Sequence, residues 1–142
     1  MKNSTVGRSK GSMNNVVKTK CVKLPPEPHD GKRFLVTRGW PPFKSRASLQ
    51  IQDWIKSVAP SRRLLADWRG GAISWDQYVR RYTSEMSQQT HEIEKLAKLA
   101  EKETITLLCY EREGDPHCHR YLLKEMIEEH LVLFPNHSLV PG

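Results

Sequence analysis

The apolar segments of this chain alternate between short strand-like runs and longer helical ones, and this order restricts the fold most. Residues 34–36 and 104–110 are short runs of apolar and β-branched side chains, typical of strands inside a sheet. Apolar residues recur at helical spacing in residues 47–58, 61–68 and 74–86, and again after Thr90. Strands joined through helices need crossover connections. The sequence therefore predicts an α/β fold, a small mainly parallel sheet of about four strands with helices packed on it.

Two further strands complete this prediction. Residues 16–24 are β-branched and partly alternating, which indicates a strand with one solvent-facing side. Residues 131–134 form a last short apolar run, which Pro135 ends. The chain length of 142 residues suits one domain. We expect a flexible basic arm at residues 1–15, the α/β domain at 16–135 and a C-terminal tail at 136–142.

Composition excludes several classes of protein. No stretch approaches the roughly 20 apolar residues that span a bilayer, and no apolar segment follows the basic N-terminus as in a secretory signal. Three cysteines at irregular spacing do not form a disulfide framework. We therefore expect a cytoplasmic protein with reduced thiols, no membrane contact and no cofactor.

The net charge of +7 is concentrated in the first third of the chain. Residues 1–46 carry eleven Lys and Arg against two acids, a balance of +9, whereas the remainder has twelve basic and fourteen acidic residues. Such asymmetry is typical of proteins that contact phosphates, although a solubilising tail has the same signature. The predicted partner is RNA, DNA or a ribonucleoprotein particle. The candidate contacts are Lys10, Lys18, Lys20, Lys23, Lys32, Arg33, Lys44 and Arg46.

Candidate chemistry gathers after the strand at 104–110. Ligands of parallel sheets bind beyond the carboxyl ends of the strands, here residues 37–41 and 109–111 with the loop to residues 118–120. A zinc site is not favoured, because the sequence lacks two spaced ligand pairs, and no metal is predicted. A cysteine-phosphatase loop is rejected, because Lys124 replaces the required Arg and no glycine lies between it and Cys118.

Three readings of this cluster stay open. If the protein is an enzyme, Cys118 at a helix start is the nucleophile, with His119 and Glu111 assisting. A second reading is an anion site formed by Arg120 and the helix N-terminus, joined by Arg38 and Trp40 at the other strand exit. The third is structural: Cys109 is buried, His119 and Arg120 bind the loop, and Trp40 seals the sheet edge.

Five segments of this sequence together resemble one known family. They read GKRFLVTRGWPP at residues 31–42, DWIKSVAPS at 53–61, SWDQYVRRYTSEM at 74–86, TITLLCYE at 104–111 and HCHRYLL at 117–123. In this order they resemble the YeaO-like branch of the domain of unknown function 488. The resemblance implies a single α/β domain, but it supplies no established activity.

The chain departs from this family's pattern at the first strand exit. Thr37 stands where the family has Asp, and Pro42 and Phe43 replace Arg-Gly, while the element at 118–120 is retained. If relatives use that Asp and Arg in catalysis, the resemblance implies that this member has lost the activity. The sequence therefore favours a nucleic-acid or ribonucleoprotein-binding module that uses the basic first third. The alternatives are an enzyme acting on a small anionic or nucleotide-like substrate at the strand exits, or a protein-interaction module.

Overall fold

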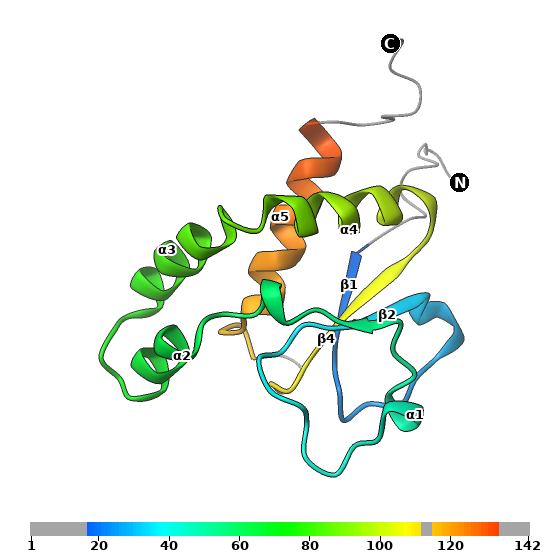
Figure 1. Cartoon of the computed structure of the whole chain (residues 1–142), viewed down its shortest axis with the longest axis horizontal. Helices are drawn as coiled ribbons and strands as arrows, with labels where there is room; N and C mark the ends of the chain where they lie inside the picture. Colours follow the sequence, from blue (N-terminus) through cyan, green and yellow to red (C-terminus); the bar gives the residue numbers. More distant parts are fainter. Residues whose placement is uncertain (1–16, 112–114, 134–142) are drawn as a thin grey trace, which may run out of the picture.

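A computed structural model describes residues 17–111 and 115–133 (Figure 1). Its centre is a parallel sheet of four strands, β1 (Val17–Cys21), β2 (Lys32–Leu35), β3 (Asp53–Trp54) and β4 (Ile105–Cys109), in the order β1-β4-β2-β3. The helices are α1 (Arg46–Leu49), α2 (Arg62–Arg69), α3 (Trp75–Met86), α4 (Thr90–Lys102) and α5 (His119–Leu133), with 3-10 turns η2 (Pro28–Asp30) and η3 (Lys56–Val58). The predicted α/β fold is therefore confirmed. The arm at 1–15 and the tail at 136–142 lie outside the described residues.

Helices cover one face of the sheet. Alternate residues of β4, Ile105 and Leu107, face a large core to which α3, α4 and α5 contribute Tyr82, Leu96 and Leu123. In Figure 1, α4 and α5 lie together over the strands, and α2 and α3 extend to one side. None of the described helices is long and apolar enough to cross a membrane.

The opposite face of the sheet is covered by loops instead of long helices. Leu35 and Leu108 form a small apolar cluster there with Leu49 of α1, and Trp40 and Trp54 pack against its edge. Beside it, Asp30 of η2 binds Arg33 at 2.6 Å and Lys20 at 3.1 Å, and all three residues are buried. This ionic cluster ties the β1–β2 connection to the sheet.

Two predicted elements are wrong. Residues 47–58 do not form one helix, because α1 ends at Leu49 and the next residue, Gln50, has a left-handed conformation with φ 50°. The chain then extends so that Asp53 and Trp54 pair with Phe34 and Leu35. Local spacing did not reveal this pairing, since the partner strand lies about twenty residues earlier in the chain.

The last predicted strand is also wrong within the described residues. Residues 131–133 continue α5, and Phe134 lies outside the described part of the chain. Leu123, Ile127 and Leu131 recur every four residues and contact the same core, so the helical face continues through the apolar run. Burial of that face outweighs the strand preference of the short segment.

Candidate functional site

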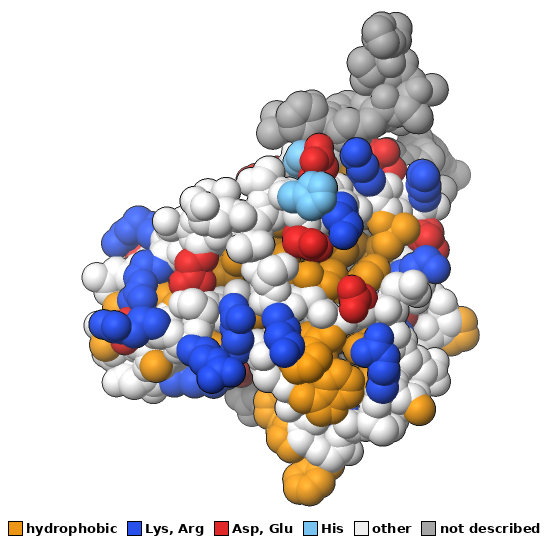
Figure 2. Space-filling model, viewed as in Figure 1, with side chains coloured by type: hydrophobic (Ala, Val, Ile, Leu, Met, Phe, Trp, Pro, Cys, Tyr) orange, Lys and Arg blue, Asp and Glu red, His pale blue; other side chains and the backbone are white. Residues whose placement is uncertain are grey.

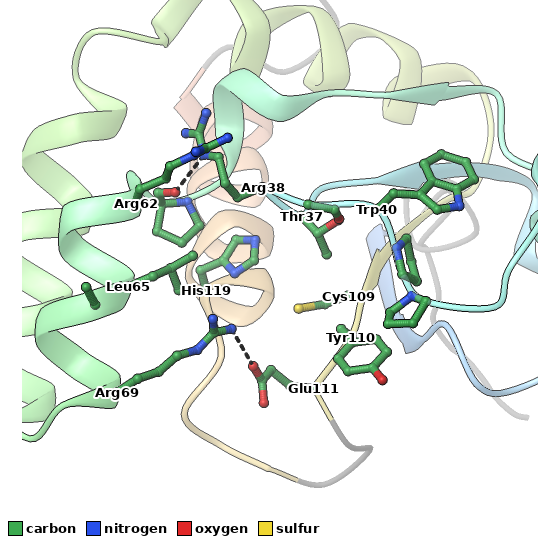
Figure 3. Close-up of a pocket in the computed structure, with 15 residues that line it drawn as sticks. Thr37, Arg38, Trp40, Arg62, Leu65, Arg69, Cys109, Tyr110, Glu111 and His119 are labelled. Carbon is green, nitrogen blue, oxygen red and sulfur yellow. Dashed lines mark hydrogen bonds and ion pairs between the residues drawn. The ribbon is translucent and has the colours of Figure 1, made fainter.

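A pocket of about 430 Å³ opens at the carboxyl edge of the sheet (Figure 3). Its walls are residues 37–42 after β2, residues 109–111 at the end of β4, one side of α2, and His119 in the first turn of α5. Its volume is within the range of small-molecule sites. The two strand exits that the sequence singled out therefore border one cavity, and α2 supplies a third wall.

Two thiols meet at the inner wall of this pocket. The Sγ atoms of Cys109 and Cys118 lie 3.0 Å apart, both cysteines are buried, and no disulfide joins them. Cys109 lines the pocket, whereas Cys118 lies behind it, outside the pocket lining. Figure 3 shows the Cys109 sulfur directed towards the cavity. Substrate in the pocket would therefore meet Cys109 and not Cys118.

The pKa values of the two thiols are shifted in opposite directions. The hydrogen bond from the Cys118 S–H, against the opposing effect of burial, lowers the pKa of Cys109, and His119 adds to the lowering. The same hydrogen bond, together with burial, raises the pKa of Cys118. Of the two sulfurs, the one that faces the pocket is therefore the more acidic, and Cys118 is the hydrogen-bond donor.

The ring of His119 is fixed between the thiols and the β2 exit. Its Nε2 lies 2.6 Å from the carbonyl oxygen of Val36, which can only accept, so Nε2 carries a hydrogen. Its Nδ1 lies 4.0 Å from the Cys118 Sγ. The ring of Tyr82 contacts His119 edge-on from the core side. His119 can therefore exchange a proton through Nδ1 without turning its ring.

The same three side chains are of metal-ligating types. One ligand atom from each of Cys109, Cys118 and His119 lies within 4.8 Å of the others. Two thiolates on tetrahedral zinc are about 3.7 Å apart, since each Zn–S bond is about 2.3 Å. The observed 3.0 Å is shorter and places the two sulfurs in direct contact, with Cys118 as the hydrogen-bond donor. The geometry therefore fits a reactive thiol pair better than a metal centre.

Arginines surround the outer part of the pocket. Arg62 and Arg69 lie on the same side of α2, two turns apart, with Leu65 between them. Arg69 approaches Glu111 at 3.6 Å, whereas Arg62 forms no ion pair within residues 17–111 and 115–133.

Arg38, the third arginine of the pocket lining, donates to the carbonyls of Ala59 and Pro60 and so holds the chain after β2 in place. Figure 2 shows Lys and Arg side chains gathered over the α2 and α3 side of the molecule.

Two predicted anion ligands have other contacts. Arg120 is fully buried and does not line the pocket, and its guanidinium donates to the Glu111 carbonyl at 2.9 Å and to the Tyr121 hydroxyl at 2.9 Å. Trp40 lines the pocket, but its Nε1 donates to the Lys44 carbonyl at 2.6 Å. Arg120 therefore positions the loop after β4, as the structural reading of the cluster expects.

The predicted nucleic-acid contacts are divided between surface and interior. Lys20 and Arg33 are buried in ion pairs with Asp30, and Lys20 also pairs with Glu27, so both cations have carboxylate partners within the fold. Lys18 donates to the His29 carbonyl, and Lys23 lies over the Tyr110 ring. Lys23 and Arg46 are exposed, Lys18, Lys32 and Lys44 are half-buried, and Lys10 lies outside the described residues.

Sequence reasoning missed Arg62 and Arg69 of this site, and it predicted Cys109 to be buried without predicting that it lines a pocket. Arg62 and Arg69 stand seven residues apart in a predicted helix, a spacing that places both on one face. Cys109 follows Ile105 and Leu107 at strand spacing, which places it on the core face where α5 begins. Those signals were readable, but nothing local showed that α2 closes over the strand exits.

Comparison with known proteins identifies the family. Residues 17–131 match the family model described as DUF488-N3a, active DUF488-N3 subclade. The chain belongs to the DUF488 family. It is 30% identical over 111 residues to "Uncharacterized protein YeaO" of Escherichia coli (strain K12), covering 78% of this chain and 96% of that protein. It is also 30% identical over 80 residues to "Uncharacterized protein Rv3073c" of Mycobacterium tuberculosis (strain ATCC 25618 / H37Rv), covering 56% of this chain and 67% of that one. No solved structure matches significantly.

Proposed function

We propose that this DUF488 member is an enzyme that uses the Cys109 thiolate as a nucleophile on a small anionic substrate. One observation carries the proposal: Cys109 lines a pocket while a second thiol, 3.0 Å behind it, donates a hydrogen bond to its sulfur. A thiolate is the nucleophilic form of cysteine, and a neighbouring donor keeps it populated at neutral pH. The description of the matched subclade as active is in keeping with this proposal.

In this proposal the surrounding residues bind the anionic group and transfer the proton. Arg62 and Arg69 attract and orient the anionic group. His119, through Nδ1, gives or takes the proton that the reaction moves. Glu111 holds Arg69 at 3.6 Å and is displaced from it as substrate binds. The Asp expected at position 37 is not needed, because Thr37 here donates its hydroxyl hydrogen to the Gly39 carbonyl and serves the turn.

Alkylation with iodoacetamide tests the nucleophile. We expect the Cys109 rate to stay nearly constant from pH 8 down to about pH 6, whereas an ordinary thiol with a pKa near 8.5 slows roughly tenfold per pH unit. Cys118→Ala removes the donor and should restore the ordinary pH profile, while Cys118→Ser keeps an O–H donor and most of the effect. Mass spectrometry of proteolytic peptides measures the alkylation of Cys109 and of Cys21 separately. A Cys109 that reacts no faster than Cys21 at pH 6 overturns the proposal.

The charge of the pocket is tested by comparing iodoacetate, an anion, with neutral iodoacetamide. Each arginine charge near the protein surface stabilises an anionic reagent at the pocket by roughly 0.5–1 kcal/mol. We therefore expect the double variant Arg62→Gln and Arg69→Gln to lower the iodoacetate-to-iodoacetamide rate ratio at Cys109 about fivefold or more. Arg63→Gln is the matched control, because Arg63 is on the same helix but outside the pocket lining. An equal loss in the control would show a general charge effect and contradict the anion site.

One observation favours a second function, binding of single-stranded nucleic acid. Phe43 is fully exposed, at 105%, and holds φ 62° at a loop tip next to Lys44 and close to Arg46. An exposed ring beside cations can stack on a base. We expect log affinity for a single-stranded oligonucleotide to fall by about 0.7 per phosphate contact per log unit of salt. Phe43→Ala should weaken binding about fivefold or more. Unchanged affinity in this variant would contradict the stacking site.

A further inference from the structure

We propose that Cys109 and Cys118 form a dithiol–disulfide centre that reduces small anionic disulfides. This inference rests on the proposed nucleophile and names its substrate class. The two sulfurs need to approach by only about 1 Å to form a bond of about 2.0 Å. A single nucleophilic cysteine would not require a second thiol at contact distance, so the pair itself points to exchange chemistry.

The two thiols have the different positions that such a reaction requires. Cys109 lines the pocket and meets the substrate, whereas Cys118 lies behind it, outside the pocket lining and in contact with the Cys109 sulfur. A third thiol, Cys21, lies opposite Cys109 in the β1–β4 ladder, but it is buried, donates to the Tyr110 carbonyl at 3.8 Å and does not line the pocket. The geometry thus gives Cys109 the attacking role and Cys118 the resolving role.

The reaction balances in two exchange steps. The Cys109 thiolate attacks one sulfur of the substrate R–S–S–R, which forms a Cys109–S–S–R mixed disulfide and releases R–S⁻. The Cys118 thiol then loses its proton and attacks the Cys109 sulfur, which forms the Cys109–Cys118 disulfide and releases the second R–S⁻. That proton passes to His119 Nδ1, 4.0 Å from the Cys118 sulfur, or to the departing thiolate. An external dithiol such as dithiothreitol restores the reduced pair and is itself oxidised.

The arginines determine which disulfides are accepted. Arg62 and Arg69 give the pocket mouth an excess of positive charge over Glu111. A carboxylate on the substrate would pair with these guanidinium groups while its disulfide reaches Cys109. Of three probes with the same reactive bond, the dianion 3,3′-dithiodipropionate should react fastest, neutral 2-hydroxyethyl disulfide next, and dicationic cystamine slowest.

The decisive experiment treats the reduced protein with each probe and follows its mass. In the native protein we expect dithiodipropionate to remove two hydrogens and link the peptides that contain Cys109 and Cys118. Cys118→Ser should instead accumulate the mixed disulfide at Cys109, and Cys109→Ser should give neither product. We expect at least about a tenfold rate difference between the anionic and cationic probes, reduced several-fold by Arg62→Gln with Arg69→Gln. Far-UV circular dichroism of each variant, with Cys118→Ala as a second replacement, controls for folding.

The outcomes separate this inference from the proposed function. If iodoacetamide alkylates Cys109 at pH 6 but no Cys109–Cys118 link forms with any probe, the disulfide centre is overturned and the nucleophile stands. Mixed disulfide that persists in the native protein as long as in Cys118→Ser likewise overturns the resolving role. If Cys109 is inert to iodoacetamide and to all three disulfides, both proposals fail. Equal rates with the anionic and cationic probes overturn the assigned substrate class.

Discussion

Cys109 and Cys118 are the same residue type in contact, yet their surroundings give them different properties. Cys109 accepts a hydrogen bond and lines the pocket, while Cys118 donates that bond from the first position before α5. Neither property belongs to cysteine itself. The hydrogen-bond role follows from the neighbouring sulfur at 3.0 Å, and access to the pocket follows from the side on which the cavity lies. For the case of an enzyme, the sequence predicts Cys118 as the nucleophile, whereas the function proposed above assigns that role to Cys109.

Asp30 carries a residue-level prediction. It is buried, and although burial opposes its ionisation, hydrogen bonds from the Glu27 backbone and from Lys20 and Arg33 keep its pKa below the ordinary value. Asp30→Asn leaves Arg33 buried without its carboxylate, while Lys20 keeps Glu27 at 2.7 Å, so we expect the free energy of unfolding to fall by about 3–5 kcal/mol in urea titrations. Asp76→Asn, at an exposed position in the first turn of α3, should cost less than about 1 kcal/mol.

The same residue predicts a pH dependence. Because the folded pKa of Asp30 is lowered, its contribution is fully present above its unfolded value near 3.9 and is lost as the pH falls through the folded value. The native protein should therefore lose stability more steeply than Asp30→Asn between about pH 5 and pH 2. Parallel pH profiles of the two proteins would show that Asp30 is not the responsible group.

At the scale of elements, the turn into β2 depends on a glycine. Gly31 has φ +67°, and a Cβ built there would lie 2.1 Å from the Thr104 carbonyl oxygen, which accepts the Lys32 N–H at the start of the β2–β4 ladder. Gly31→Ala must shift that ladder or the turn. We expect it to lower the free energy of unfolding by about 2 kcal/mol or more.

Gly39→Ala is the matched control for this turn. A Cβ at Gly39 meets nothing within 4 Å, and its φ lies outside the left-handed region. We expect Gly39→Ala to change the free energy of unfolding by less than about 0.5 kcal/mol. Equal destabilisation by the two substitutions would mean that loss of glycine, and not the contact with β4, determines the cost.

At the scale of the whole molecule, the described core is built from residues 17–131, and the family match spans the same residues. We therefore expect a chain without residues 1–15 to keep its free energy of unfolding within about 0.5 kcal/mol and its Cys109 alkylation rate. Nucleic-acid affinity, if the second function holds, should fall, since Lys2, Arg8 and Lys10 are removed. If the chain without residues 1–15 does not fold, the prediction is wrong and those residues contribute to the stability of the domain.

Other features of the whole molecule follow from local patterns in the sequence. The strand at 104–110, the helices at 61–68 and 74–86, and the capping box of Ser74 with Gln77 depend on residues a few positions apart, and the structure has an element at each of these places. The crossover rule then placed ligand chemistry at the strand exits, where the pocket lies. The sequence also predicted that Cys109 is buried at the end of its strand, and the structure has it buried.

Tertiary structure alone decided the rest, because those features join residues far apart in the chain. The pairing of β3 with β2 replaced a predicted helix, and burial of Lys20 and Arg33 beside Asp30 turned presumed surface cations into internal ones. The two thiols are 3.0 Å apart only once β4 and α5 are assembled. The pocket beside Cys109 in turn needs α2 as one of its walls. A distance between sulfurs nine residues apart across a loop has no signature in local spacing, so the sequence located the site while the fold determined its chemistry.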